Sequence, residues 1–373
     1  MNDYTEVFVG IDTSKLRNAV AIAEGGRNGE VRYLGEIDNT QAATKKLVAK
    51  LCKRYGKLTF CYEAGPTGYG LHRWLTELGQ ANMVVAPSLI PRRPGDRVKT
   101  NRRDAQGLAK LLRAGELTAV WVPDAAHEAM RDLVRARDAA VKDLRAKRQQ
   151  LTSFLLRQSL TYPGKTAWTK THFRWLCGLK FAHHAQRLVL EESLSAIQEA
   201  QARIARIEKA IQELAPGWSL APAVEAIQAM RGFGFIAAVS FLAEVGDLSR
   251  FAKPSQVMGY LGLTPSEGST GESVKRGPIT KAGNSRARRT LVESAWSYRF
   301  PARLGPQKRA KIEGLPKPAA AIDWKAQTRL CARFRALTAK GKAQGFVVTA
   351  IARELAAFLW AIAREVPLAK AQG

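Results

Sequence analysis

The chain has 373 residues, with 59 Lys and Arg against 32 Asp and Glu, which gives a formal net charge of +27 at pH 7. This length favours two or three domains over one core, and an apolar content of 46% argues against general disorder. So large a positive excess attracts polyanions, so nucleic acid is the expected partner and an anionic membrane surface is the alternative.

Other features bear on the location of the chain. The apolar stretch at residues 346–366 is interrupted by Arg353, Glu354 and Arg364, and its apolar residues recur at helical spacing, so we expect a core helix rather than a membrane span. The first residues lack the pattern of a signal peptide. The cysteines (Cys52, Cys61, Cys177 and Cys331) form no Cys-x-x-Cys pair, which argues against a zinc site or a disulfide framework. We expect a cytoplasmic protein without a membrane segment.

The first 120 residues alternate between strand and helix patterns. Strands are predicted over residues 6–11, 18–24, 31–37, 58–62 and 81–86, and helices over 41–55, 70–78 and about 104–114. Three early strands with short links predict an antiparallel meander, which parallel strands alternating with helices then follow. This order is typical of an α/β domain with the ribonuclease-H-like layout.

The middle of the chain is predicted to be helical. Apolar residues spaced three and four apart form a seam, Ile197, Ala200, Ile204, Ile207, Ile211 and Leu214, and a weaker seam is Val134, Val141, Leu144, Leu151 and Leu155. Two such helices, joined by an insertion that holds Trp168, Phe173 and Trp175, can pair as an antiparallel coiled coil. The sequence leaves open whether they pair within one monomer or between two.

The last part opens with a helix, a Gly232-Phe233-Gly234 turn and a second helix. This helix-hairpin-helix pattern brings backbone N–H groups close to a phosphate, although a simple helical hairpin gives the same pattern.

Acidic residues follow apolar strands in the first domain. Asp12 and Glu63 each end a predicted strand, and Asp104 opens a predicted helix, three residues after Asn101. Oxygen ligands that converge at strand ends suit Mg²⁺, and metals held there can activate an attacking oxygen in phosphodiester chemistry. Each acid alone is better explained as a surface charge or a helix cap, but their joint placement favours a metal site.

Basic residues surround these acids, and we expect them to hold a phosphate backbone rather than form a merely solvated face. The predicted nucleic-acid-binding residues here are Arg92, Arg93, Arg97, Lys99, Arg102 and Arg103.

A second candidate site is the glycine-flanked segment Ser269-Thr270-Gly271. A hydroxyl there can attack phosphorus within a basic surrounding, although such a loop is more often a plain turn. The basic residues predicted to bind nucleic acid beside it are Lys275, Arg276, Lys281, Arg286, Arg288 and Arg289.

Several of these motifs, taken in chain order, resemble those of the "one-ten" insertion-sequence transposases, a family that includes the Piv-type DNA invertases. The matching segments are Gly10-Ile11-Asp12-Thr13-Ser14-Lys15, Tyr62-Glu63-Ala64-Gly65, Val98 to Ala105, Gly262 to Glu267 and Ile279 to Asn284. The chain is similar in particular to the "eleven-eleven" subgroup.

The resemblance implies three regions: a ribonuclease-H-like, Holliday-junction-resolvase-like DEDD domain at residues 1–120, a coiled coil at 125–216 and a helical transposase domain at 221–373. It also implies Mg²⁺-dependent recombination of donor and target DNA through a covalent serine link. A noncoding guide RNA that pairs with both DNAs, and a dimer of dimers in which the carboxylates of one subunit meet the serine of another, are further implications.

The chain departs from the family pattern at two places. The third carboxylate of the family falls on the neutral Asn101, whose amide oxygen is a weaker metal ligand. The serine before the family's glycine falls on Thr270 in strict register, whereas serine identity favours Ser269, so we expect Ser269 to be the nucleophile, then Thr270 and then Ser273.

The sequence therefore predicts an RNA-guided DNA transposase. A structure-selective metal-dependent nuclease and a catalytically decayed nucleic-acid-binding protein are the alternatives.

Overall fold

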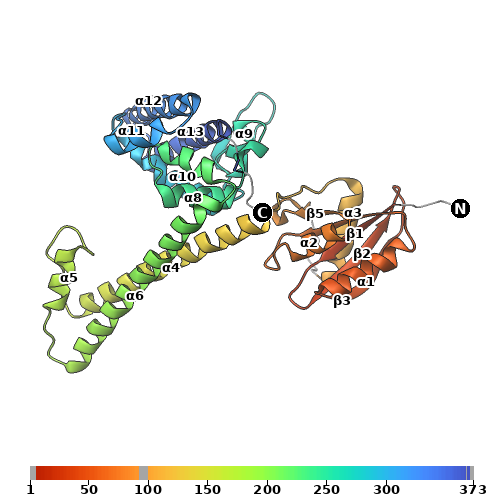
Figure 1. Cartoon of the computed structure of the whole chain (residues 1–373), viewed down its shortest axis with the longest axis horizontal. Helices are drawn as coiled ribbons and strands as arrows, with labels where there is room; N and C mark the ends of the chain where they lie inside the picture. Colours follow the sequence, from red (N-terminus) through yellow and green to blue (C-terminus); the bar gives the residue numbers. More distant parts are fainter. Residues whose placement is uncertain (1–5, 92–99, 367, 370–373) are drawn as a thin grey trace. The chain divides into compact units, whose positions relative to one another are not determined.

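The structure of the chain is a computed structural model that describes residues 6–91, 100–366 and 368–369, apart from the side chain of Gln307. The chain divides into two compact units, of which the first ends at Val122 and the second begins at Pro123. Figure 1 labels the helices and strands of both units.

A sheet of five strands, in the order β3-β2-β1-β4-β5, is the centre of the first unit. The strands are β1 (Glu6–Asp12), β2 (Arg17–Glu24), β3 (Val31–Asp38), β4 (Lys57–Glu63) and β5 (Ala81–Val85). β1, β2 and β3 pair antiparallel, whereas β1, β4 and β5 pair parallel. The predicted meander and parallel strands are thereby confirmed, and the sheet is compatible with a ribonuclease-H-like domain.

Helices cover both faces of this sheet. Side chains alternate between the faces along a strand, so Val7, Val9 and Ile11 of β1 are buried on the face that α1 (Gln41–Cys52) and α2 (Gly70–Glu77) cover. The other face of the sheet carries α3 (Asn101–Ala114). Between β5 and α3 lies the one-turn helix η1 (Pro87–Leu89).

Gly10 allows α3 to lie directly on β1. A Cβ atom at this position would lie 2.4 Å from both the carbonyl oxygen of Ala105 and the amide nitrogen of Ala109. Any side chain would therefore push α3 away from the sheet.

The second unit begins with a pair of long helices, α4 (Ala125–Arg157) and α6 (His184–Leu214), which lie side by side in Figure 1. Arg137, early in α4, forms an ion pair of 2.7 Å with Glu208, late in α6. Gln186, early in α6, donates a hydrogen bond of 2.7 Å to Gln158, which follows α4. The two helices are therefore antiparallel within one chain.

The apolar seam predicted for α6 is buried in part. Ile197, Ala200 and Ile211 are buried, whereas Leu214 is 58% exposed. α6 ends at Leu214, and the next residue, Ala215, packs into the core in its place.

The insertion between the long helices contains α5 (Lys170–Cys177) and a cluster of aromatic rings. His172 stacks on Trp175 with ring centroids 5.6 Å apart, and Trp168 meets His172 edge to face at 5.0 Å. Arg148 of α4 lies over Trp168 at 5.0 Å. These contacts show that the tryptophans serve packing at the tip of the helical pair.

Most of the remaining elements of the second unit share one large apolar core, to which β6 and α11 contribute no described residue. The remaining elements are η2 (Ala215–Gly217), α7 (Ala221–Ala229), α8 (Phe235–Val245), η3 (Leu248–Arg250), α9 (Pro254–Tyr260), β6 (Pro265–Glu267), β7 (Arg276–Ile279), α10 (Ser285–Ala295), η4 (Trp296–Arg299), α11 (Pro306–Glu313), α12 (Lys317–Ala339) and α13 (Gln344–Arg364).

α13 is long and apolar enough to cross a membrane by length and composition alone, and it is the one such helix among the described residues. Val347, Ile351, Leu355 and Leu359 are nevertheless buried in the core of the second unit. The predicted core helix at this place is therefore confirmed.

The predicted Gly-x-Gly turn joins α7 to α8. Gly232 has a φ of +87°, and a Cβ atom there would lie 2.4 Å from the carbonyl oxygen of Ser294 in α10. The need for glycine at this position is thus explained by packing against α10, while phosphate binding by the turn stays a prediction.

Candidate active site

Two carboxylates lie at the ends of neighbouring parallel strands. Asp12 is the last residue of β1 and Glu63 the last of β4, and the register pairs the residues just before them, Ile11 with Tyr62. The side chains of Ile11 and Tyr62 are buried against α1 and α2. Because successive side chains along a strand point to opposite faces of the sheet, Asp12 and Glu63 lie on the face that carries α3. Both acids are half-buried.

The loops that follow these strands contact each other. The hydroxyl of Thr67 donates a hydrogen bond of 3.2 Å to the hydroxyl of Thr13. The buried Asn18 accepts a hydrogen bond of 3.2 Å from the amide of Ser14 and donates one of 3.1 Å to Asn39. The turn after Asp12 is therefore held in place by bonds to β2 and to the start of α1.

α3 brings Asp104 towards the same edge of the sheet. Ala105 lies over Gly10, in the middle of β1, and Arg113, near the end of α3, donates a hydrogen bond of 3.0 Å to the carbonyl of Glu24. Glu24 lies opposite Val7, near the start of β1. α3 thus runs antiparallel to β1, and its first turn points to the end at which Asp12 lies.

The first turn of α3 is fixed by a helix cap. Thr100 accepts a hydrogen bond of 3.3 Å from the amide of Arg103, and the helix begins at Asn101. An acid in the first turn of a helix interacts favourably with the helix dipole, so Asp104 has a structural use as well. Asn101 lies on the same helical face, three residues earlier, and is exposed.

One atom of Asp104 fits a bound cation in particular. Its Oδ2 is buried and has no hydrogen-bond partner among the described residues, which is costly for a polar atom unless a ligand satisfies it. Among the described residues no three Asp, Glu, His or Cys side chains form a group that would by itself hold a metal ion. Mg²⁺ usually takes only one or two carboxylates and completes its shell with water and substrate phosphates. The donors present therefore fit an open divalent site.

Cys61 lies beside these acids on β4 but is a poor nucleophile. It is buried, and its thiol donates a weak hydrogen bond of 3.6 Å to the carbonyl of Leu108. Burial raises the pKa of the thiol to about 12, so it stays protonated at neutral pH and serves to pack α3 on the sheet.

The basic residues predicted near the acids are described in part. Arg102 and Arg103 are exposed on the first turn of α3, and the guanidinium of Arg102 lies 5.5 Å from the centre of the Tyr33 ring. Arg92, Arg93, Arg97 and Lys99 lie outside the described residues.

The predicted serine lies in a small β-hairpin. β6 and β7 pair antiparallel, and the amides of Thr270 and Ser273 each donate to the carbonyl of the other at 3.1 Å. Gly271, in the turn between them, has a φ of +58°, which favours glycine. The hydroxyl of Ser269 donates a hydrogen bond of 2.8 Å to Oε1 of Glu267. Ser269, Thr270 and Ser273 are all exposed, so DNA can reach each hydroxyl.

The six basic residues predicted around the hairpin fall into two groups. Lys275, Arg276 and Lys281 are exposed on or beside it. Arg288 instead donates to the backbone carbonyls of Leu261 and Ala282 at 2.8 and 2.9 Å. Arg286 and Arg289 form ion pairs of 2.9 and 2.6 Å with Asp138 of α4.

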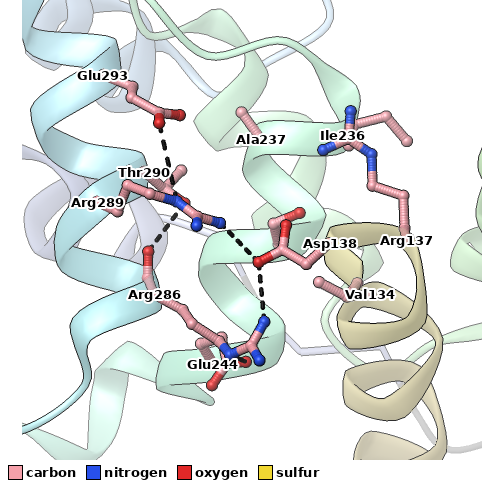
Figure 2. A pocket seen from close by; sticks show the side chains of 11 residues that line it. Val134, Arg137, Asp138, Ile236, Ala237, Glu244, Arg286, Arg289, Thr290 and Glu293 are labelled. Atoms are coloured by element: carbon pink, nitrogen blue, oxygen red, sulfur yellow. Dashed lines mark hydrogen bonds and ion pairs between the residues drawn. The ribbon is translucent and has the colours of Figure 1, made fainter. Parts of the chain in front are cut away.

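A buried acid next to these arginines was not predicted from the sequence. Glu244 of α8 accepts hydrogen bonds of 2.8 and 2.9 Å from Arg135 and one of 2.7 Å from Asn284. Figure 2 shows it beside Asp138, Arg286 and Arg289 in a pocket between α4, α8 and α10.

Burial opposes ionisation of Glu244, but the hydrogen bonds from Arg135 and Asn284 and the charges of Arg135 and Arg286 outweigh it and lower the pKa of the carboxyl. No local pattern marks this cluster, because Asp138, Glu244 and Arg286 are far apart in the sequence.

A mixed sheet with carboxylates at its strand ends, followed by a largely helical unit, is compatible with an enzyme that acts on DNA. Residues 224–309 match the profile of the transposase IS116/IS110/IS902 family, and residues 9–159 match that of the DEDD transposase domain of IS110. The chain belongs to this family of insertion-sequence transposases.

Similar proteins support this membership over almost the whole chain. The y4qE protein of Sinorhizobium fredii (strain NBRC 101917 / NGR234) is 56% identical over 97% of this chain and 90% of its own length. The transposase for insertion sequence element IS1533 of Leptospira borgpetersenii is 31% identical over 90% of this chain and 98% of its own length. The DEDD domain also indicates a divalent metal.

Proposed function

We propose that this transposase moves its insertion sequence by RNA-guided recombination, in which a serine joins covalently to DNA. The observation that carries the proposal is the exposed Ser269 hydroxyl, held in a hairpin among exposed basic side chains. Motif similarity to the "eleven-eleven" subgroup and to Piv-type invertases supports the same reading.

The first unit supplies the metal-binding groups in this proposal. Asp12, Glu63 and Asp104 would hold Mg²⁺, with Asn101 as a weaker ligand, and the ion would supply positive charge to the phosphate oxygens. Arg102 and Arg103 position the backbone of the nucleic acid at this edge of the sheet. The partly buried positions of the acids limit the access of water to them.

The second unit supplies the nucleophile. Ser269 attacks the scissile phosphate and holds the strand end until a new strand accepts it, with Thr270 as the second candidate. Lys275, Arg276 and Lys281 contact donor and target DNA or the guide RNA. We further propose that the protein acts in the cytoplasm as a dimer of dimers.

A strand-cleavage assay tests the role of the carboxylates. Purified protein, the noncoding RNA encoded beside its gene, and labelled donor and target DNA are mixed with Mg²⁺. We expect Asp12→Asn, Glu63→Gln and Asp104→Asn each to reduce the cleavage rate by at least about 10²-fold, because each removes charge from the metal site.

Two controls accompany this assay. Glu116→Gln removes an exposed acid just beyond the end of α3 and should leave the rate unchanged, and omission of the RNA should abolish cleavage at the target. Cleavage that persists in all three carboxylate variants would contradict the metal site, and cleavage that is independent of the RNA would contradict guidance.

A further inference from the structure

The side chains of Ser269 and Glu267 form a pair, and the proposed function assigns no role to Glu267. Ser269 lies two residues beyond Glu267, the last residue of β6, and Ser269 Oγ donates to Glu267 Oε1 at 2.8 Å. This distance is normal for a hydroxyl bound to a carboxylate.

The hairpin restrains both residues. The amide of Gly268, which lies between them, donates to the carbonyl of Lys275 at 3.0 Å. The mutual bonds of Thr270 and Ser273 close the turn beyond Ser269, and the hydroxyl of Ser266 donates to the carbonyl of Pro278 at 3.0 Å. The backbone on either side of Glu267 and Ser269 is thus tied to β7 or closed on itself.

A third group lies next to the carboxylate. Arg276, opposite Glu267 in the ladder, places its Nε 4.0 Å from Oε2 of Glu267. The ion pair involves the oxygen that does not bind the serine. A nucleophile, a base and a group that orients the base are the elements of an activated hydroxyl.

We propose that Glu267 is the general base for Ser269, an inference that rests on the proposed function. As the bond from Ser269 Oγ to phosphorus forms, the hydroxyl proton passes to Oε1 of Glu267. The bond from phosphorus to the oxygen of the leaving strand breaks, and that oxygen takes a proton from solvent. When a strand hydroxyl later attacks the phosphoserine, its oxygen bonds to phosphorus and its proton passes to solvent. The bond from Ser269 Oγ to phosphorus breaks, and Glu267 returns its proton to Ser269 Oγ.

The test measures the rate of covalent adduct formation in a single turnover at saturating DNA, from acidic to alkaline pH. We expect Glu267→Gln to lower this rate by about 10²–10⁴-fold, the range typical of general-base catalysis. The pH dependence of the rate should differ between wild type and Glu267→Gln, because the variant keeps the metal-binding carboxylates and lacks only the proposed base. The other charged groups of the hairpin are Lys275, Arg276 and Glu272.

Two variants separate the base from other roles. Glu272→Gln removes the same charge from the turn of the same hairpin and should form the adduct at the wild-type rate. Glu267→Asp keeps a carboxylate and should give an intermediate rate with the pH dependence of wild type, which a purely structural role would not produce.

The outcomes distinguish this inference from the proposed function. An adduct that forms in Glu267→Gln at the wild-type rate and with the wild-type pH profile overturns the role of Glu267 and leaves the serine mechanism intact. An adduct that is absent from wild type but accompanied by cleaved DNA overturns the serine mechanism and the base together.

Discussion

Glu244 of α8 joins α4 and α10 through buried polar contacts. Its side chain is only 2% exposed, and it binds Arg135 of α4 and Asn284, the cap of α10. His127 adds a contact of 2.9 Å to the carbonyl of Ala243. A buried acid with several charged partners is costly to disrupt, because removal of its charge leaves those partners unpaired.

We expect Glu244→Gln to lower the free energy of unfolding by about 2 kcal/mol at neutral pH. The pKa of this carboxyl is lower in the folded protein than in the unfolded chain. The stabilisation that the ionised carboxyl provides is therefore complete above its pKa in the unfolded chain, and it is lost as the pH falls towards its pKa in the folded protein. The difference between wild type and variant, measured by urea denaturation, should therefore shrink below about pH 4.5.

Glu293→Gln is the matched control for this prediction. Its side chain is 71% exposed and lies 3.8 Å from Arg289, and such surface pairs contribute only about 0–1 kcal/mol. An equal loss of stability in both variants, or a loss in Glu244→Gln that does not change with pH, would contradict the role given to Glu244.

The basic residues predicted to bind nucleic acid also divide into two groups. Lys275, Arg276 and Lys281 are exposed beside the serine, whereas Arg288 satisfies two backbone carbonyls. A basic residue in a sequence motif is therefore no guide by itself to DNA contact, because the fold uses some of these charges internally.

Among the elements, α3 is the one that couples the sheet to the proposed metal site. Its packing depends on Gly10, where a Cβ atom would meet the backbone of α3 at 2.4 Å. We expect Gly10→Ala to lower the free energy of unfolding by about 1–3 kcal/mol through overpacking, and to reduce metal-dependent cleavage because Asp104 shifts with the helix.

Gly107, on α3 itself, is the control, because a Cβ atom there would meet nothing within 4 Å. Gly107→Ala should stabilise the protein by up to about 1 kcal/mol through helix propensity and leave cleavage unchanged. Thermal denaturation and the cleavage assay check both variants. Full stability and activity in Gly10→Ala would show that α3 does not need this close approach.

The elements of the first unit could be predicted closely from the sequence. The apolar runs that end in Asp12 and Glu63 were predicted to be strands, and in the structure they are neighbouring parallel strands. Short strands that alternate with helices usually pair in parallel. The start of α3 was expected near Asp104 and lies at Asn101, because Thr100 caps the helix.

The second unit was less accessible to prediction. The antiparallel pairing of α4 and α6 within one chain depends on contacts such as Arg137 with Glu208, which no local periodicity reveals. The bond between Ser269 and Glu267 was also missed. It forms within the β6–β7 hairpin, whereas the glycines of this segment indicated only a loop.

At the scale of the whole molecule, the chemical groups are divided between the two units. The carboxylates belong to the unit that ends at Val122, and the serine hairpin belongs to the unit that begins at Pro123. The net charge of +27 favours long-range attraction of nucleic acid to the chain. The proposed dimer of dimers would bring both kinds of site to one phosphate.

In the proposed function, Ser269 becomes covalently joined to DNA. The measurement is a denaturing gel of wild type, Ser269→Ala and Thr270→Ala, each incubated with the neighbouring noncoding RNA, labelled donor and target DNA, and Mg²⁺. We predict a protein–DNA adduct in wild type and Thr270→Ala that is lost in Ser269→Ala. Cleaved DNA without an adduct, in amounts that neither substitution changes, would contradict the claim and indicate a nuclease that uses water.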